Sequence, residues 1–400
     1  MVKIMQLVQQ VQLKRSRLLD NITFLSKNLY NLATYEVRQR FFKDRHWIRY
    51  IELWNTLKSH GAYQELQKTC GSHPPQQVLK QVDKNFKSFF NAMKQWKREP
   101  SKFRGMPKLP HYKHKNGRNL LYFTSLQCRL RDGVILLTQK MEKLGFPKIN
   151  TYLKNVKGVR IVPFGDRYNI ELIYDYNPRD LHLNEKNVMG IDLGLTNIVT
   201  SSDNIGNNPL IIKGGVVKSI NQFYNKQLAK YKSSSKKCNN TDATSRILRL
   251  HRKRNNKIRD FFHKASRTII NNCISNDIGT IIIGYNEGWK QKIKIGKKNN
   301  QNFVSIPFQK LVHQIEYKSE MVGIKVVRIT EEYTSQVCSS CGVVRKSNRK
   351  YRGLYVCKEC EMVLNADVNA SRNIMCKGVP ESLRIGDRGC LNHPVVLKVY

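Results

Sequence analysis

The chain contains 400 residues, with 71 lysines and arginines, 29 aspartates and glutamates, and a formal net charge of +42. An excess of this size would make a compact protein repel itself unless a polyanion were bound, and nucleic acid is the natural polyanion. The composition argues against a membrane partner and a secreted disulfide scaffold, because the sequence has no run of about 18 apolar residues, no lipidation signal and no signal-peptide core. We therefore expect a nucleic-acid-binding protein of two or three domains that is not secreted.

Two apolar patterns with helical spacing lie in the first hundred residues. The first runs from Leu18 to Phe41, and the second starts after Pro74 and Pro75 and reaches Trp96. Basic and aromatic side chains alternate along them, which suits phosphate contact and base stacking but equally suits a bundle with a solvated basic face. These patterns predict a helical domain over residues 16–100.

A linker rich in proline, glycine and basic residues follows at 101–118, and we interpret it as a segment that contacts nucleic acid. Short β-type runs separated by turn residues come after it. They lie at 120–123, 133–138, 159–162 and 168–174, and the run at 3–13 suits the same sheet. The pattern predicts a small sheet or barrel formed by 1–15 and 101–185.

Strands that alternate with helices begin near residue 186. Apolar strands are predicted at 188–194, 198–200, 210–212, 280–283 and 325–329, with helices at 246–272 and from Pro307 onward. Such alternation is typical of an α/β core with parallel strand pairs.

Four cysteines show the spacing of a metal site. Cys338 and Cys341 form one C-x-x-C pair, and Cys357 and Cys360 form a second after a basic interval. Two thiolate pairs on separate turns can enclose Zn²⁺ tetrahedrally, whereas a redox dithiol would need one pair. With four protein ligands the ion has no open position, so we expect a structural zinc site that also suits phosphate contact.

Two aspartates stand out against their surroundings. Asp192 lies in the apolar strand, where a carboxylate is costly unless a cation compensates it; capping of the following turn is the alternative. Asp367 lies in the first turn of a predicted helix just after the cysteines, where it points to the sheet or simply stabilises the helix dipole. A third acid is needed to hold two Mg²⁺ ions, and Glu287, Glu331 and Glu332 are the candidates.

Three motifs together resemble the transposon-encoded TnpB nucleases, and still more their eukaryotic and viral relatives, the Fanzor proteins. The motifs are GIDLGLTN at 190–197, TSQVCSSCG at 334–342 and NADVNASRNI at 365–374. The resemblance is specific over 187–376 and weaker before it. It implies an α/β, multi-domain protein with a ribonuclease-H-like RuvC nuclease domain (186–337 and 361–376) interrupted by a zinc ribbon (338–360). A wedge-like β-barrel domain (1–15 and 101–185), a helical recognition domain (16–100) and a C-terminal tail (377–400) complete the implied layout.

The chain departs from the common TnpB pattern at Gly284, where that pattern has a catalytic glutamate directly after the strand at 280–283. Family members that lack this glutamate resemble the present chain, because they have a glutamate three residues before the Thr-Ser pair at the start of the ribbon. In this chain that residue is Glu331. The resemblance therefore implies Asp192, Glu331 and Asp367 as ligands of catalytic Mg²⁺ or Mn²⁺. Glu332 and Glu287 are successively weaker substitutes for the third ligand.

The resemblance implies RNA-guided cleavage of double-stranded DNA at one RuvC site, associated with transposition. The implied partners are an omega-type guide RNA and target DNA with a short flanking motif, bound in a monomeric ribonucleoprotein. We expect a nuclear location in a eukaryotic or viral host, and otherwise the cytoplasm or nucleoid. Gly284 leaves a nuclease-dead, RNA-guided DNA-binding repressor open as an alternative. A DNA-strand-transferring transposase is a further alternative, although no tyrosine or serine nucleophile motif is present.

Overall fold

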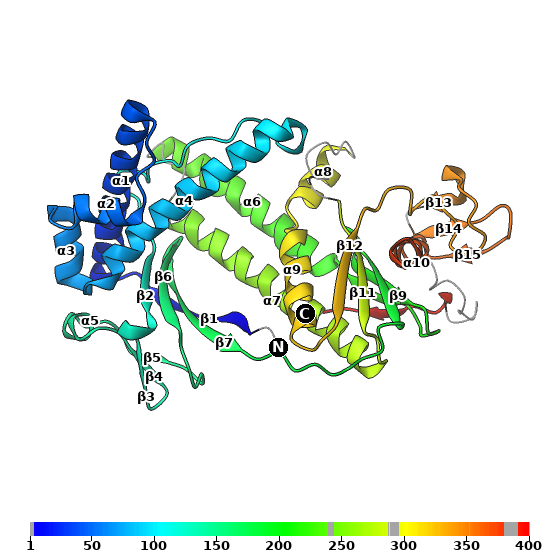
Figure 1. The fold of residues 1–400 in the computed structure, drawn as a ribbon. Coiled ribbons are helices and arrows are strands. Elements are labelled where there is room, and N and C mark those ends of the chain that lie inside the picture. Colours follow the sequence, from blue (N-terminus) through cyan, green and yellow to red (C-terminus); the bar gives the residue numbers. More distant parts are fainter. Residues whose placement is uncertain are drawn as a thin grey trace. The chain divides into compact units, whose positions relative to one another are not determined.

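The structure is a computed structural model of the chain, and it describes residues 4–238, 244–286, 288, 296–351, 353–379 and 391–399. The chain divides into two compact units (Figure 1). The amino-terminal unit is Ile4–Tyr176, and the carboxy-terminal unit begins at Asn177. Within the described residues, every helix is too short or too polar to cross a bilayer.

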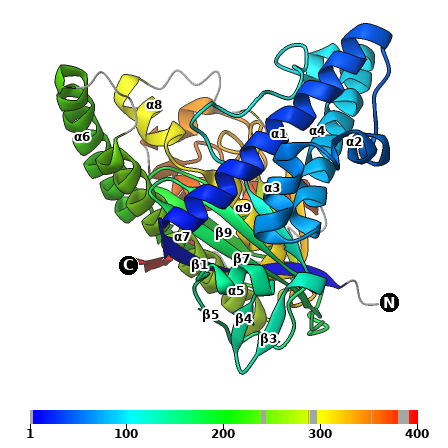
Figure 2. The same cartoon turned by 90° about the vertical axis from the view of Figure 1, so that its left-hand side faces the viewer.

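The amino-terminal unit contains a group of four longer helices (Figure 2). They are α1 (Arg17–Asp44), α2 (Tyr50–Leu57), α3 (Gly61–Cys70) and α4 (His73–Arg98). Helix α1 begins at the Ser16 cap, and Pro74 and Pro75 lie in the first turn of α4, where a missing N–H costs little. The two long predicted helices are confirmed, whereas α2 and α3 were not predicted.

The β-strands of this unit form two separate sheets. Strands β1 (Met5–Lys14), β7 (Arg167–Tyr176), β6 (Gly158–Phe164) and β2 (Leu121–Thr124) form an antiparallel sheet in that order. Strands β3 (Arg129–Arg131), β4 (Val134–Leu136) and β5 (Ile149–Asn150) form the second, with the short helix α5 (Gln139–Lys143) between β4 and β5. The predicted small sheet is therefore found, whereas the wedge-like barrel is not confirmed among the described residues, because the edge strands β1 and β2 do not pair with each other.

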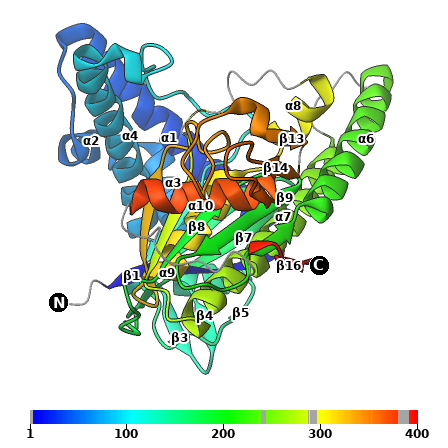
Figure 3. The same cartoon turned by 90° about the vertical axis from the view of Figure 1, so that its right-hand side faces the viewer.

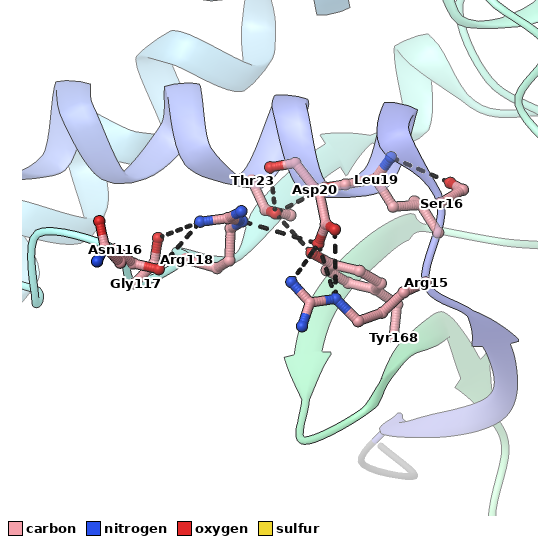
Figure 4. Close-up of polar contacts among 9 residues, drawn as sticks. All are labelled: Arg15, Ser16, Leu19, Asp20, Thr23, Asn116, Gly117, Arg118 and Tyr168. Carbon is pink, nitrogen blue, oxygen red and sulfur yellow. Dashed lines mark hydrogen bonds and ion pairs between the residues drawn. The ribbon is translucent and has the colours of Figure 1, made fainter. Parts of the chain in front are cut away.

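A polar network joins the start of α1 to the four-stranded sheet (Figure 4). The carboxylate of Asp20 accepts hydrogen bonds from the Tyr168 hydroxyl at 2.6 Å and from Arg15 at 2.9 and 3.1 Å. Arg118 lies 3.8 Å from the same carboxylate and donates to the carbonyl oxygens of residues 116 and 117. Burial alone would raise the pKa of Asp20, but the Tyr168 and Arg15 hydrogen bonds and the two guanidinium charges lower it below its usual value.

The carboxy-terminal unit is built on a six-stranded mixed sheet. Its order is β12 (Lys325–Ile329), β11 (Thr280–Gly284), β8 (Val188–Asp192), β9 (Asn197–Asp203), β10 (Leu210–Lys213) and β16 (Val395–Leu397). Strands β8, β11 and β12 are parallel, so their carboxyl ends meet at one edge of the sheet. The predicted α/β core with parallel pairs is confirmed, and β16 adds an unpredicted strand from the segment expected to be a tail.

Helices cover both faces of this sheet (Figures 1 and 3). Helices α7 (Ser245–Ser275) and α9 (Phe308–Glu320) share a core with Met189 and Ile191 on one face. Helix α10 (Ala366–Gly378) packs on Val188 and Ile282 on the other. Successive residues of one strand thus alternate between the two cores. Helices α6 (Gly215–Cys238), which was not predicted, and α8 (Lys297–Val304) complete the unit's longer helices among the described residues.

Asp20→Asn should destabilise the amino-terminal unit by about 2 kcal/mol, because Arg15 and Tyr168 lose a charged acceptor. Tyr168→Phe keeps the Arg15 pair and serves as the milder control. Since the folded pKa of Asp20 lies below 3.8, its stabilisation is complete above that pH and is lost as the pH falls through the folded pKa. Hydrogen exchange of α1 and β7 peptides at pH 7 measures the effect, and equal exchange in D20N and wild-type protein would contradict the role given to the network.

Candidate active site and zinc centre

Asp192 lies at the carboxyl end of β8, next to the end of β11 in the sheet. Burial, and then the charges of Glu331 and Asp367, raise the pKa of Asp192 well above its usual value, while Arg349 acts in the opposite direction. The ionised form of Asp192 is therefore unfavourable in this position until a cation binds beside it. The sequence had left a turn-capping role open, and the two neighbouring acids now distinguish Asp192 from an isolated capping residue.

Glu331 lies in the loop after β12. Its backbone N–H donates to Oδ1 of Asn286 at 3.0 Å, and its carbonyl oxygen accepts from the Thr334 hydroxyl at 2.8 Å. Its side-chain Oε1 is buried and has no hydrogen-bond partner among the described residues. Burial raises the pKa of Glu331 to about 7. An acceptor oxygen of this kind is the atom that a bound cation would satisfy.

Asp367 lies in the first turn of α10, whose amino terminus is capped by the Asn365 side chain. Its Oδ2 accepts a hydrogen bond from Asn197 at 2.8 Å, and its Oδ1 lies 3.4 Å from a guanidinium nitrogen of Arg349. Lys213 in turn donates to Oδ1 of Asn197 at 3.1 Å, which fixes the amide so that its NH₂ faces Asp367. Asn197 and Lys213 are therefore positioning residues for this carboxylate.

One pocket joins these groups. It contains about 260 Å³ that water-sized molecules can enter. Its lining consists of Asp192, Leu193, Gly194, Leu195, Thr196, Glu331, Thr334, Ser335, Arg349, Asp367 and Ala370. Three acids from distant parts of the sequence thus line a single small cavity.

The donor set fits hard divalent cations such as Mg²⁺ or Mn²⁺, which prefer oxygen ligands. The unpartnered Oε1 of Glu331 and the unfavourable charge at Asp192 both mark the pocket as suited to positive charge. Within the described part of the chain, only the cysteine cluster has all its ligand atoms within 4.8 Å of one another.

One of the weaker candidates for the third acid lies away from this pocket. Glu332 is exposed and lines a different pocket, together with Val337 and Cys376. Glu287 lies outside the described residues. Of the two glutamate candidates that the structure describes, Glu331 is the one that lines the pocket of Asp192 and Asp367.

Several residues near the site were not predicted. Arg349 comes from β13 (Arg349–Tyr351) of the cysteine-bearing segment, where the sequence suggested only general phosphate contact. Asn369 and Asn373, one turn apart on α10, donate to the carbonyl oxygen of Val337, and Asn373 also donates to that of Thr334. The asparagines of the motif at 365–374 were the available signal, since they recur on one face of the helix.

The four cysteines converge as their spacing predicted. Their sulfur atoms lie within 4.8 Å of one another, with 3.7 Å between Cys338 and Cys360 and 3.6 Å between Cys341 and Cys357. A tetrahedral Zn²⁺ with bonds of about 2.3 Å separates its sulfur ligands by about 3.8 Å, so the cluster fits zinc. Strands β13, β14 (Leu354–Val356) and β15 (Val363–Leu364) form a small antiparallel sheet beside it.

Cys357→Ser should release the metal from this cluster and loosen the segment 338–360, because the apolar core beside the cysteines is too small to hold it. We expect about one Zn²⁺ per chain in wild-type protein and less than about half in the variant, measured by mass spectrometry of the metal content. Cys376→Ser is the matched control, since Cys376 lies outside the cluster. Full zinc occupancy in the Cys357 variant would contradict the assignment.

Lys213→Met should weaken divalent-cation binding at the pocket about tenfold, because Asn197 would no longer be held facing Asp367. Lys218→Met is the control: it makes the same change of charge at an exposed position of α6. Titration of Mn²⁺ followed by calorimetry measures the difference. Equal affinity in the two variants would show that Lys213 acts only through its charge.

Two family models match parts of the chain. A model described as a probable transposase matches residues 172–290, and one described as the Cas12f1-like TNB domain matches residues 308–374. The first covers the strands that carry Asp192 and Gly284. The second covers Glu331, the cysteine cluster and Asp367.

Curated relatives agree with these matches. The CRISPR-associated endodeoxyribonuclease Cas12f1 of Sulfoacidibacillus thermotolerans is 29% identical over 62% of this chain and 60% of its own length. The putative RNA-guided DNA endonuclease InsQ of Escherichia coli K12 is 26% identical over 78% of this chain and 75% of its own. The TnpB-like protein ORF457 of Acidianus two-tailed virus is 24% identical over 91% and 84%.

A solved structure shares the fold. The Cas12f1 chain in a complex with guide RNA and target DNA matches 89% of this chain and 81% of its own with a TM-score of 0.54 and 16% identity. The family models, the curated relatives and the three motifs of the sequence point to the same group of proteins. Together these findings support a member of the TnpB-like family.

Proposed function

We propose that the chain is an RNA-guided endonuclease that cuts double-stranded DNA by metal-assisted hydrolysis of phosphodiester bonds. The observation that carries this proposal is the shared pocket of Asp192, Glu331 and Asp367, with an unpartnered oxygen on Glu331. Relatives named as endodeoxyribonucleases and as an RNA-guided DNA endonuclease support it. As the match to Cas12f1 covers 60% of that relative, its activity is carried over as a proposal.

The three carboxylates would hold Mg²⁺ or Mn²⁺, which supplies Lewis acidity to the scissile phosphate and its attacking water. Asn197 holds Asp367 through one oxygen and leaves the other at the pocket wall beside Arg349. Arg349 offsets part of the repulsion among the acids, as its effect on Asp192 indicates. This single site would cut both DNA strands in turn.

Positive charge in the amino-terminal unit supports a nucleic-acid partner. Asn31 holds both the N–H and the carbonyl oxygen of Lys113, and the buried Lys27 donates to the carbonyl oxygen of Lys115 at 2.9 Å. Lys115 and His114 are exposed on this fixed segment. A segment ordered in advance loses little entropy when it binds phosphate, so it suits the predicted contact with nucleic acid.

We infer the binding partners from this positive charge and from the resemblance to the family. A guide RNA encoded beside the gene would bind the basic surfaces, and its base pairing would select the DNA, while the protein reads a short flanking motif. We propose a monomeric ribonucleoprotein, with Zn²⁺ bound by the four cysteines as a structural ion. A nuclear location in a eukaryotic or viral host remains a prediction, as does the likeness to Fanzor proteins.

The repressor alternative depended on Glu331 failing to reach the metals. Glu331 lines the same pocket as the two aspartates, so no observation on the described residues favours a nuclease-dead protein. The transposase alternative likewise gains no support from a nucleophile at this site. Neither is proposed as the function.

The test is to purify the protein with the RNA expressed from its own locus, sequence that RNA, and add a plasmid with a matching target. We expect cleavage of both strands in Mg²⁺, and a loss of at least about 100-fold in rate for Asp192→Ala and for Glu331→Gln. Glu332→Gln, an exposed acid next in sequence, is the control and should cleave at the wild-type rate. Target binding without cleavage in Mg²⁺ or Mn²⁺ by the wild-type complex would overturn the proposal.

A further inference from the structure

Gly284 and Glu331 share one volume beside Asp192. The strand register pairs Ile283 with Ile191 and Gly284 with Ile329, so residue 284 adjoins Asp192 at the edge of the sheet. A Cβ atom at residue 284 would lie 2.7 Å from Cγ of Glu331 and 3.0 Å from its Oε1. The Glu331 side chain therefore lies over the end of β11 in space that only glycine leaves free.

The same region holds the backbone of Glu331 in place. Asn286, two residues after Gly284, accepts the Glu331 N–H at 3.0 Å, and the N–H of Tyr285 donates to the carbonyl oxygen of Ile329 at 2.8 Å. The chain leaving β11 and the chain leaving β12 are thus joined at two successive points beyond the sheet. This connection directs the loop that carries Glu331 back toward the pocket.

We propose that Gly284 and Asn286 are positioning residues that allow a carboxylate from the loop after β12 to take the place that a side chain at the end of β11 would fill. The two arrangements compete for the same space, because a Cβ atom at residue 284 would lie 2.7 Å from Cγ of Glu331 and would force that side chain to shift. To move the carboxylate from the loop after β12 to the end of β11, both positions must therefore change together: residue 331 must lose its glutamate and residue 284 must gain one. The role of this carboxylate in metal binding rests on the proposed function, whereas the steric exclusion does not.

Ile374 of α10 sets the remaining limit on residue 284. Its Cδ1 atom would lie 2.5 Å from a Cβ atom there. Ile374→Val removes that atom and normally costs about 1 kcal/mol in a core. Moving the carboxylate from residue 331 to residue 284 is therefore best tested in protein that already carries Ile374→Val.

The first experiment compares Glu331→Ala, Gly284→Glu and the double variant in that background, using the full chain with its RNA. Calorimetric titration with Mn²⁺ and DNA cleavage are the readouts. We expect Glu331→Ala to weaken Mn²⁺ binding about tenfold or more, and the added Gly284→Glu to restore it to within about threefold. Gly284→Glu with Glu331 retained should bind worse than the double variant. A double variant no better than Glu331→Ala, in a protein whose parent binds Mn²⁺ and cleaves, would overturn the inference.

A second experiment tests the steric part without metal or activity. Gly284→Ala is introduced into wild-type protein and into Glu331→Ala protein, and thermal unfolding is recorded with no added Mg²⁺ or Mn²⁺ and no chelator. We expect the loss in Tm to be smaller by about 3 °C or more when Glu331 is absent, because the clash is then reduced to Ile374. Equal losses would overturn the inference even if the nuclease is active. A smaller loss combined with no Mn²⁺ binding by wild-type protein would uphold the exclusion and remove the proposed function instead.

Asn286 has its own pair of variants. Asn286→Ala removes the acceptor of the Glu331 N–H, whereas Asn286→Asp keeps an oxygen at that position. We expect Mn²⁺ affinity to fall about tenfold in the first and to be retained in the second. Equal affinity in Asn286→Ala and wild-type protein would exclude Asn286 as a positioning residue.

Discussion

The close packing of helix α10 on strand β8 is the constraint on which the candidate site depends. At Gly190 a Cβ atom would overlap the carbonyl oxygen of Ser371 and the backbone nitrogen of Met375, so only glycine permits the helix to lie this near. The hydroxyl groups of Ser202 and Ser371 form a buried hydrogen bond of 2.6 Å across the same contact. This packing brings the first turn of α10, and with it Asp367, to the edge of the sheet where Asp192 lies.

The same helix also fixes the cysteine-bearing segment. Asn369 accepts the N–H of Ser339 and donates to Val337, while Asn373 holds Thr334 and Val337. These hydrogen bonds set the path of the chain from Glu331 to the first cysteine pair. Arg349 then returns from that segment to Asp367. The cysteine cluster and the carboxylate pocket are therefore parts of one connected structure within this unit.

The sequence predicted those features that local patterns encode. The C-x-x-C spacing predicted the cysteine cluster, and an acid inside the apolar run at 188–194 marked Asp192. The long helices α1, α4 and α7 followed from their apolar spacing. Glu331 was selected over Glu287 and Glu332 through the family resemblance, since nothing in its own segment distinguishes it.

Features that depend on tertiary contact were missed. Strand β16 is three residues long and becomes a strand only by pairing with β10. In place of the expected barrel there are two open sheets, because pairing between the edge strands is a tertiary contact that no local pattern encodes. Arg349 and Lys213 resembled any other basic residue in a chain with 71 of them. Their positions relative to Asp367 come from the fold alone.

The central claim is that Asp192, Glu331 and Asp367 hold the same divalent cations. Crystals of the protein soaked in Mn²⁺ test it most directly, because anomalous scattering locates the ions independently of any activity. The account predicts anomalous peaks in the pocket with oxygen atoms of all three carboxylates about 2.2 Å away. Peaks that contact the two aspartates but leave the Glu331 carboxylate unbound, or no peak in the pocket at saturating Mn²⁺, would contradict it.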